Sequence, residues 1–413
     1  MTSGHYNEII RFLETQTAFH GVDYLKVVLE RLKLEINPAK VILVAGTNGK
    51  GTVCAALQTL LRETDKNVGL FTSPHLERIN ERIRFNGADV TDDEFCCLFD
   101  TVHSLVSEYD LTYFEYLTFM SAYYFFCWHK DEMDFAIFEV GLGGTHDSTN
   151  VIPHSINVIA KLGMDHEDIL GNSIYDIASD KFGIIAERSM VFHLKFSPEA
   201  EEASISYRKI AKFIKAYECS MRVDVSKKYP VFFILTPLGE YEMPLPGRRA
   251  MENIALALTV FDYITPHAAE HAHAISQVRW PGRMEKAVYK SREIFISGDH
   301  NPQGIESLLE LLVYYRYAKI HFVVGICSDK KHSEMLDRLV NFPNSILYLT
   351  ETTVKTLSIH QYDEKFLKIA RCAAADPIDA LDAAVANAAV ADMIVITGSL
   401  YLVGLYRCKC ACK

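Results

Sequence analysis

Short apolar runs alternate along the chain with longer segments whose apolar residues recur at helical spacing. The first such runs are Val41–Ala45, Val68–Phe71, Phe135–Val140, Ile156–Ala160 and Met190–His193. Continuous apolar runs of this length are typical of parallel strands that are buried on both faces. Helical spacing marks 9–34 (two helices, broken at Gly21), 53–61, 116–128 and 250–264. Strands that alternate with helices predict an α/β fold with a mostly parallel sheet.

The pattern changes near the middle of the chain and then starts again. Short β-like runs such as Val231–Leu235 lie within 207–246, and Trp280–Arg283 carries turn chemistry. Four new candidate strands follow, at 294–296, 320–324, 345–348 and 393–396, with helices between them. A chain of 413 residues is long for a single core. We therefore predict two α/β domains, 1–285 and 286–413.

Charge and hydropathy narrow the class of protein. The formal net charge is −11, which disfavours a broad nucleic-acid surface, because binding phosphates requires Lys and Arg. The Met1–Tyr6 segment is polar, and Tyr116–Trp128 is shorter than the roughly 20 residues of a membrane span. We expect a cytoplasmic protein that binds neither membrane nor nucleic acid. Cys408, Cys410 and Cys412 are expected to lie on a loose, solvated tail.

A glycine-rich loop, Gly46–Thr52, connects the first apolar run to a helical segment. Such glycines let backbone N–H groups point at phosphate oxygens, and a helix start at Thr52 would add its dipole. Lys50 can then reach the β- and γ-phosphates, and the Thr52 hydroxyl can meet Mg²⁺. The spacing departs from the usual phosphate loop, because a glycine separates the lysine from the threonine. A turn that only connects strand to helix is the alternative.

Three polar residues follow predicted parallel strands and should share one sheet edge. Glu139 ends the Phe135 run, Ser73 follows the Val68 run, and His166 follows the Ile156 run. A buried acid at this edge is a plausible Mg²⁺ ligand, although an acid that caps a turn is the simpler alternative. Taken singly, Ser73 and His166 are ordinary turn residues. Lys181 sits on a helical segment, where pattern alone favours a surface lysine.

These motifs occur in a recognisable order. They are AGTNGKGT (45–52), FTSPHLERINERI (71–83), TYFEYLT (112–118), FEVGLGG (138–144), DSTN (147–150), GMDHEDILG (163–171), LPGRRAMEN (245–253), WPGRME (280–285), DHNP (299–302) and TGSLYLVG (397–404). Together they resemble folylpolyglutamate synthase and bifunctional dihydrofolate synthase/folylpolyglutamate synthase of the Mur ligase superfamily. The resemblance implies a phosphate-loop ATPase domain that binds ATP and folate (1–285) and a smaller Rossmann-like glutamate-ligase domain (286–413).

The resemblance also implies residue roles. Lys50, His166 and Lys181 would be catalytic, and the metal ligands would be Ser73, Glu139, His166 and a carbamylated Lys181. The ATP contacts would be Thr47, Asn48, Gly49, Lys50, Gly51, Thr52, Asn253, Arg283, Ser297, Asp299, His300 and Asn301. The substrate contacts would be Glu115, Thr118, His146, Asp147 and Ser148. The expected partners of a monomeric enzyme are ATP, L-glutamate, Mg²⁺ and dihydropteroate or a reduced folate, with a monovalent cation left open.

The sequence departs from the family pattern in three places. Thr145-His146 replaces an Arg-Leu pair, Arg249-Ala250 replaces His-Gln, and the acid expected at 297 stands at 299. These departures keep two alternatives open: an amide ligase of the same superfamily that acts on a non-folate carboxylate, and a nucleotide-binding protein that has lost catalysis.

Overall fold

The computed structural model describes residues 2–17 and 20–412, which divide into two compact units. Unit 1 comprises Met1–Cys219, Thr236–Gly239 and Glu252–Val278, and unit 2 comprises Ser220–Leu235, Glu240–Met251 and Arg279–Lys413. Both units are α/β, and the predicted fold class is confirmed. Helix α9 (Arg248–Ile264) begins in unit 2 and continues into unit 1.

Unit 1 is built on an eight-stranded sheet with the order β4-β3-β2-β5-β1-β6-β7-β8. Its strands are β1 (Val41–Ala45), β2 (Val68–Phe71), β3 (Ile83–Phe85), β4 (Ala88–Asp89), β5 (Phe135–Glu139), β6 (Ile156–Ile159), β7 (Met190–His193) and β8 (Lys212–Lys215). From β2 to β8 in this order every neighbouring pair is parallel, whereas the β2–β3 and β3–β4 pairs are antiparallel. The central strand β1 is buried throughout, as its continuous apolar run predicts.

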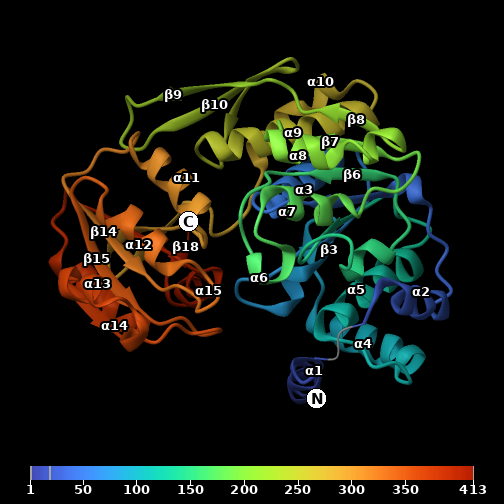
Figure 1. The fold of residues 1–413 in the computed structure, drawn as a ribbon, viewed down its shortest axis with the longest axis horizontal. Helices are drawn as coiled ribbons and strands as arrows, with labels where there is room; N and C mark the ends of the chain where they lie inside the picture. Colours follow the sequence, from blue (N-terminus) through green and yellow to red (C-terminus); the bar gives the residue numbers. More distant parts are fainter. Residues whose placement is uncertain (1, 18–19, 413) are drawn as a thin grey trace. The chain divides into compact units, whose positions relative to one another are not determined.

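Helices cover both faces of this sheet (Figure 1). The α-helices of unit 1 are α1 (Thr2–Glu14), α2 (Val22–Arg31), α3 (Lys50–Arg62), α4 (Asp92–Val106), α5 (Tyr113–Tyr123), α6 (Glu167–Leu170), α7 (Ile174–Phe182), α8 (Pro198–Ser204), α10 (Ala268–His271) and the unit 1 part of α9. Helix α3 packs on β1, β2 and β5. Alternate β1 residues Val41, Leu43 and Ala45 join the hydrophobic cluster that contains the apolar faces of α1, α2, α4 and α5. The sheet is thus fixed on both sides, which holds its loops in place.

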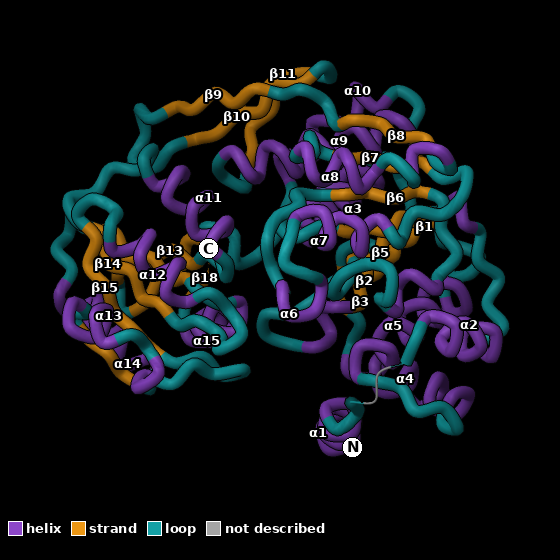
Figure 2. Tube along the Cα trace, viewed as in Figure 1, coloured by secondary structure: helices purple, strands orange, loops and turns teal. Residues whose placement is uncertain are grey.

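Unit 2 contains a seven-stranded sheet with the order β16-β15-β14-β17-β13-β12-β18 (Figure 2). Its strands are β12 (Glu285–Tyr289), β13 (Arg292–Ile296), β14 (Ile320–Val324), β15 (Ser345–Thr350), β16 (Cys372–Ala374), β17 (Met393–Thr397) and β18 (Ala411–Cys412). Its helices are α11 (Pro302–Leu312), α12 (His332–Val340), α13 (Glu364–Ile369), α14 (Pro377–Asn387) and α15 (Leu400–Lys409). The five strands from β16 to β13 are parallel. A three-stranded sheet of β9 (Ser220–Asp224), β10 (Val231–Thr236) and β11 (Gly239–Met243) precedes it in the chain.

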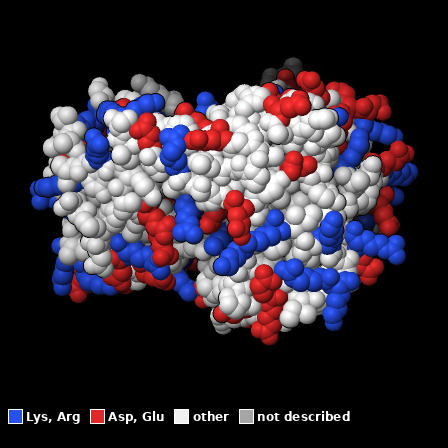
Figure 3. Space-filling model, turned by 90° about the horizontal axis from the view of Figure 1, so that it is seen from above, with Lys and Arg blue, Asp and Glu red and all other residues white. Residues whose placement is uncertain are grey.

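Two local expectations are wrong. The cysteine-rich C-terminus is no loose tail, because Cys408 lies on α15, and β18 pairs antiparallel with β12. Helix α3 begins at Lys50, with Gly49 as its N-cap, so it starts two residues before the predicted Thr52. Throughout residues 2–17 and 20–412, no helix is long and apolar enough to cross a membrane. Acidic and basic side chains are interspersed on the face shown in Figure 3.

Candidate active site

The predicted polar residues of unit 1 meet at one edge of its sheet. Strands β2, β5, β1 and β6 are adjacent and parallel, so their carboxyl ends point the same way. Val44 of β1 lies opposite Glu139 of β5, and Ala45 lies opposite Ile159 of β6. Glu139 is the last residue of β5, Ser73 and His166 lie in the segments after β2 and β6, and Lys50 begins α3 after the β1 loop. This edge is where open α/β sheets bind ligands.

The glycine-rich loop is held by backbone carbonyls of the segment that follows β6. The Thr47 and Asn48 N–H groups donate to the Lys161 carbonyl at 2.8 and 3.1 Å, and the Thr47 hydroxyl donates to the Gly163 carbonyl at 2.9 Å. Gly49 has φ +92°, which disfavours any side chain. The loop is therefore preformed as a curl in front of the N-terminus of α3.

Two polar side chains face this curl. The Lys50 ammonium donates to the Gly46 carbonyl at 3.0 Å, so it folds back over the loop. A Cβ on Gly49 would collide with the amide of Asn253 from α9. Asn253 is 2% exposed, and its Oδ1 has no hydrogen-bond partner among the residues that the structure describes. A buried amide oxygen without a partner costs about 1–3 kcal/mol. An incoming donor would remove that cost, which makes Asn253 a good ligand contact.

Glu139 and Ser73 lie in direct contact. The buried Glu139 carboxylate accepts a hydrogen bond from the Ser73 N–H at 3.0 Å. Carboxylate and hydroxyl oxygens are ligands that Mg²⁺ prefers, so this pair fits a divalent metal. His166 follows at the same edge in a left-handed conformation (φ +54°). Among the residues described, no group of three or more His, Cys, Asp and Glu side chains is placed to hold a metal by itself. The predicted ligand set also includes a serine and a modified lysine.

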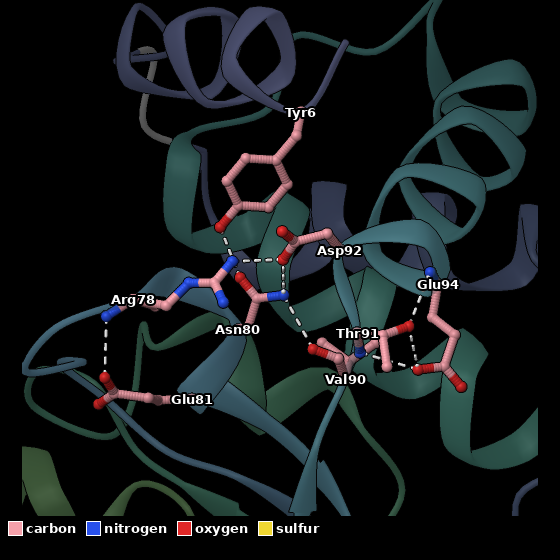
Figure 4. A network of polar contacts seen from close by, with 8 residues as sticks. All are labelled: Tyr6, Arg78, Asn80, Glu81, Val90, Thr91, Asp92 and Glu94. Carbon is pink, nitrogen blue, oxygen red and sulfur yellow. Dashed lines mark hydrogen bonds and ion pairs between the residues drawn. The ribbon is translucent and has the colours of Figure 1, made fainter. Parts of the chain in front are cut away.

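The loop after β2, which carries Ser73, is built by a polar network that pattern analysis did not identify (Figure 4). The Glu81 carboxylate accepts from the backbone N–H groups of Leu76, Glu77 and Arg78 at 2.8 Å each. Asn80 accepts from the Tyr6 hydroxyl of α1 at 2.5 Å and donates to the Val90 carbonyl at 2.8 Å. These contacts fix the loop on both sides.

The same loop brings a histidine and an arginine together. The Arg82 Nε donates to His75 Nδ1 at 2.9 Å, and the Arg82 guanidinium lies over the Tyr113 ring. Burial, with the nearby Arg82 charge, lowers the pKa of His75 to about 4, so the imidazole is neutral at pH 7. Neither residue was singled out from the sequence, although both lie in the FTSPHLERINERI motif.

Lys181 is a buried residue of α7 and is only 4% exposed, in contrast to the surface lysine that pattern alone favours. Burial, together with the charge of Lys50, lowers the pKa of Lys181 to about 7. About half of the Lys181 side chains therefore carry a neutral, nucleophilic amine at neutral pH. Such an amine can add CO₂, as carbamylation requires.

The turn after β5 is organised by Asp147. Its Oδ2 accepts from the Gly141 and Leu142 N–H groups at 3.0 Å each, and its Oδ1 accepts from the Thr149 N–H at 3.0 Å. The Asp147 carboxyl is buried, and burial raises its pKa. Asp147 therefore shapes the Gly141–Gly144 turn from behind.

The other predicted substrate contacts differ in their surroundings. The Thr118 and Ser148 hydroxyls are 2.7 Å apart and buried, and His146 is exposed. Glu115 caps α5 by accepting from the Thr112 N–H at 2.7 Å. Burial raises the pKa of Glu115.

In unit 2 the predicted residues form the loop between β13 and α11. Ser297 donates to Asp299 Oδ2 at 2.7 Å, Arg283 donates to the Gly298 carbonyl at 3.2 Å, and Asn301 caps α11. Arg249, which the sequence offered only as a departure from the family pattern, donates to Asp299 Oδ1 at 2.5 Å. No local pattern could predict this pair, because the two residues lie 50 positions apart.

Comparison with known proteins matches most of the chain. The Mur ligase middle domain family matches residues 44–261, and the Mur ligase glutamate ligase domain family matches residues 282–400. The "Dihydrofolate synthase/folylpolyglutamate synthase" of Bacillus subtilis (strain 168) is 30% identical over 409 residues, which cover 94% of each chain.

Solved structures of folylpolyglutamate synthases share the fold of this chain. A bifunctional folylpolyglutamate synthase/dihydrofolate synthase with Mn, AMPPNP and L-glutamate bound is 26% identical, with a TM-score of 0.83 over 98% of this chain and 97% of that chain. An FPGS–AMPPCP–folate complex is also 26% identical, with a TM-score of 0.82 over 97% of this chain and 98% of that chain.

Proposed function

Because the chain belongs to the dihydrofolate synthase/folylpolyglutamate synthase family of Mur ligases, which are ATP-dependent ligases, we propose that it joins L-glutamate to a pteroyl acceptor. The acceptor is dihydropteroate, a reduced folyl-glutamate, or both. Related structures are described with a folate, with L-glutamate and with ATP analogues bound, which supports this choice of substrates.

One observation carries the proposal: a phosphate loop, a buried carboxylate and a buried lysine converge at the carboxyl edge of one sheet. Lys50, Glu139 and Lys181 come from three separate segments, and the buried Lys181 titrates near neutrality beside Lys50. A protein that only binds nucleotide gains nothing from burying a second lysine there, since burial of an ammonium costs free energy. This argument disfavours the catalytically lapsed alternative.

The reaction runs in two steps. A carboxylate oxygen of the acceptor attacks the γ-phosphorus of ATP, ADP leaves, and an acyl phosphate forms. The glutamate amine then attacks the acyl carbon, phosphate leaves, and the amine loses a proton. The backbone N–H groups at the start of α3, which the Lys161 carbonyl does not occupy, and the Lys50 ammonium hold the phosphates and stabilise negative charge as it shifts to the leaving oxygen.

Ser73, Glu139, His166 and carbamylated Lys181 are proposed to hold Mg²⁺, with Glu139 and Ser73 already in contact. Bound there, Mg²⁺ would neutralise phosphate charge. Thr47, Asn48, Gly49, Thr52 and Asn253 are proposed to bind ATP from unit 1, and Arg283, Ser297, His300 and Asn301 from unit 2. Glu115, Thr118, His146 and Ser148 are proposed to face the pteroyl group.

Residues 1–285 are proposed to bind ATP and folate, and residues 286–413 to serve glutamate ligation. We further propose that the enzyme is a cytoplasmic monomer. The family matches at 44–261 and 282–400 support this division of labour.

The test is phosphate release from ATP with L-glutamate and Mg²⁺, measured with dihydropteroate, with tetrahydrofolate and without acceptor. Stimulation by dihydropteroate supports dihydrofolate synthase activity, and stimulation by tetrahydrofolate supports chain extension. If protein that binds ATP responds to neither acceptor, the folate assignment is wrong, and a non-folate amide ligase takes its place.

A further inference from the structure

We propose that Arg249 is an anion-binding residue, oriented by the buried carboxylate of Asp299, and that its ligand is a phosphate or carboxylate group of a substrate. The inference deepens the proposed function and rests on it for the identity of the two candidate anions: the phosphates of ATP and the carboxylates of glutamate.

Asp299 is a buried carboxylate that is held at both of its oxygens. Its side chain is 2% exposed, with Oδ1 bonded to Arg249 at 2.5 Å and Oδ2 bonded to Ser297 at 2.7 Å. Its main-chain carbonyl accepts from the Gly398 N–H at 3.0 Å, which ties it to the end of β17. Asp299 is therefore a fixed support for the guanidinium.

Arg249 is placed to meet a ligand. Its side chain is 27% exposed, whereas that of Asp299, which accepts from its Nη2, is 2% exposed. A guanidinium has five N–H donors, and within the described part of the chain Asp299 is the only hydrogen-bond partner that the structure shows for Arg249. The remaining donors are available for a planar or tetrahedral anion.

The electrostatics favour an ionised support. Burial opposes ionisation of Asp299, but the charge of Arg249 and the Ser297 hydrogen bond outweigh it, so the pKa of Asp299 lies below its usual value. Arg283 also acts on this carboxylate and donates to the Gly298 carbonyl at 3.2 Å. Both arginines and the aspartate belong to unit 2. A carboxylate that accepts a hydrogen bond from an arginine holds the guanidinium group in one orientation. The arginine side chain therefore loses less conformational freedom when an anion binds.

The experiment compares Arg249→Met, Arg249→Lys and Asp299→Asn with a matched control, Arg248→Met. Arg248 is the exposed neighbour on the same helix and loses the same charge when substituted. Titration calorimetry measures the affinity for AMPPNP with Mg²⁺, and then for L-glutamate added to protein saturated with AMPPNP. Neither titration needs turnover, so its result is separate from the acceptor-stimulated phosphate release that tests the proposed function.

We expect Arg249→Met to lower the affinity for one of the two ligands, AMPPNP or L-glutamate, at least tenfold. Asp299→Asn should lower the affinity for the same ligand at least threefold. Arg249→Lys should fall between wild type and Arg249→Met, because an ammonium keeps the charge but loses the fork. Weaker AMPPNP binding assigns the site to phosphate, and weaker glutamate binding assigns it to carboxylate.

The control should change either affinity less than twofold. Unchanged affinities in all Arg249 and Asp299 variants, even with a lower thermal midpoint, would show that the pair serves only stability and would overturn the proposal. An affinity loss in Arg248→Met equal to that in Arg249→Met would overturn it as well. If Arg249→Met does not fold, Arg249→Lys and Asp299→Asn, which nearly preserve side-chain size, still decide between these outcomes.

Discussion

Replacing the buried Lys181 should make unit 1 more stable, and the gain should shrink as the pH rises. The folded-state pKa of Lys181 is about 7, against an ordinary value of 10.5. Between these two values the unfolded chain binds a proton that the folded chain does not, so the lysine's cost is greatest at low pH and falls as the pH increases. Lys181→Met removes this titration and keeps a side chain of similar length.

The magnitude follows from the two pKa values. At 1.36 kcal/mol for each pKa unit, the cost is about 5 kcal/mol well below pH 7, about 4 kcal/mol at pH 7 and about 2 kcal/mol at pH 9. We therefore expect the stabilisation by Lys181→Met to fall by about 2 kcal/mol between pH 7 and pH 9.

The assay is urea unfolding in buffers free of CO₂, so that Lys181 stays unmodified. The chain has two tryptophans; Trp128 belongs to unit 1, and Trp280 to unit 2. A Trp280→Phe background leaves Trp128 to report on unit 1 alone. The exposed Lys195 provides the control, because Lys195→Met should show no comparable dependence on pH. The reasoning is refuted if the stability difference between Lys181→Met and its parent is the same at pH 7 and pH 9.

Three further substitutions test the site. Lys50→Ala should lower kcat by at least about 100-fold, since it removes the ammonium that folds over the phosphate loop; kinetics that keep wild-type ATP-dependent ligation would contradict the role given to Lys50. Gly49→Ala should weaken AMPPNP binding at least tenfold, because a Cβ would collide with Asn253 and strain the backbone at φ +92°; calorimetry showing unchanged affinity would argue against this loop geometry. Asp147→Ala should cost about 2–4 kcal/mol in urea unfolding, because the Gly141, Leu142 and Thr149 N–H groups lose their acceptor; a loss below 0.5 kcal/mol would show that the turn does not depend on Asp147.

Strands were predicted best where burial on both faces leaves a continuous apolar run. Val68–Phe71, Met190–His193 and Ile320–Val324 begin and end where the sequence predicts. Their positions put the following loops on one edge, which is why the phosphate loop, Ser73, Glu139 and His166 could be grouped without coordinates.

The burial of Lys181 and the pairing of Arg249 with Asp299 could not be predicted, because they depend on contacts between segments that are distant in the sequence. Lys181 reads as a surface residue, because the sequence does not show which helix face the Gly143–Gly144 turn will cover. The Arg249–Asp299 pair has no local signature for the same reason. The Thr112–Glu115 capping box, by contrast, is a local signal that the predicted helix start at 116 overlooked, and it explains part of what Glu115 does.

The central claim is that the acceptor carboxylate becomes an acyl phosphate, and oxygen transfer tests it most directly. Dihydropteroate or tetrahydrofolate labelled with ¹⁸O in the carboxylate that receives glutamate would be incubated with ATP, L-glutamate and Mg²⁺, and the released phosphate analysed by mass spectrometry. The account predicts one ¹⁸O in each phosphate released with ligated product. Ligated product together with phosphate that carries no ¹⁸O would contradict it.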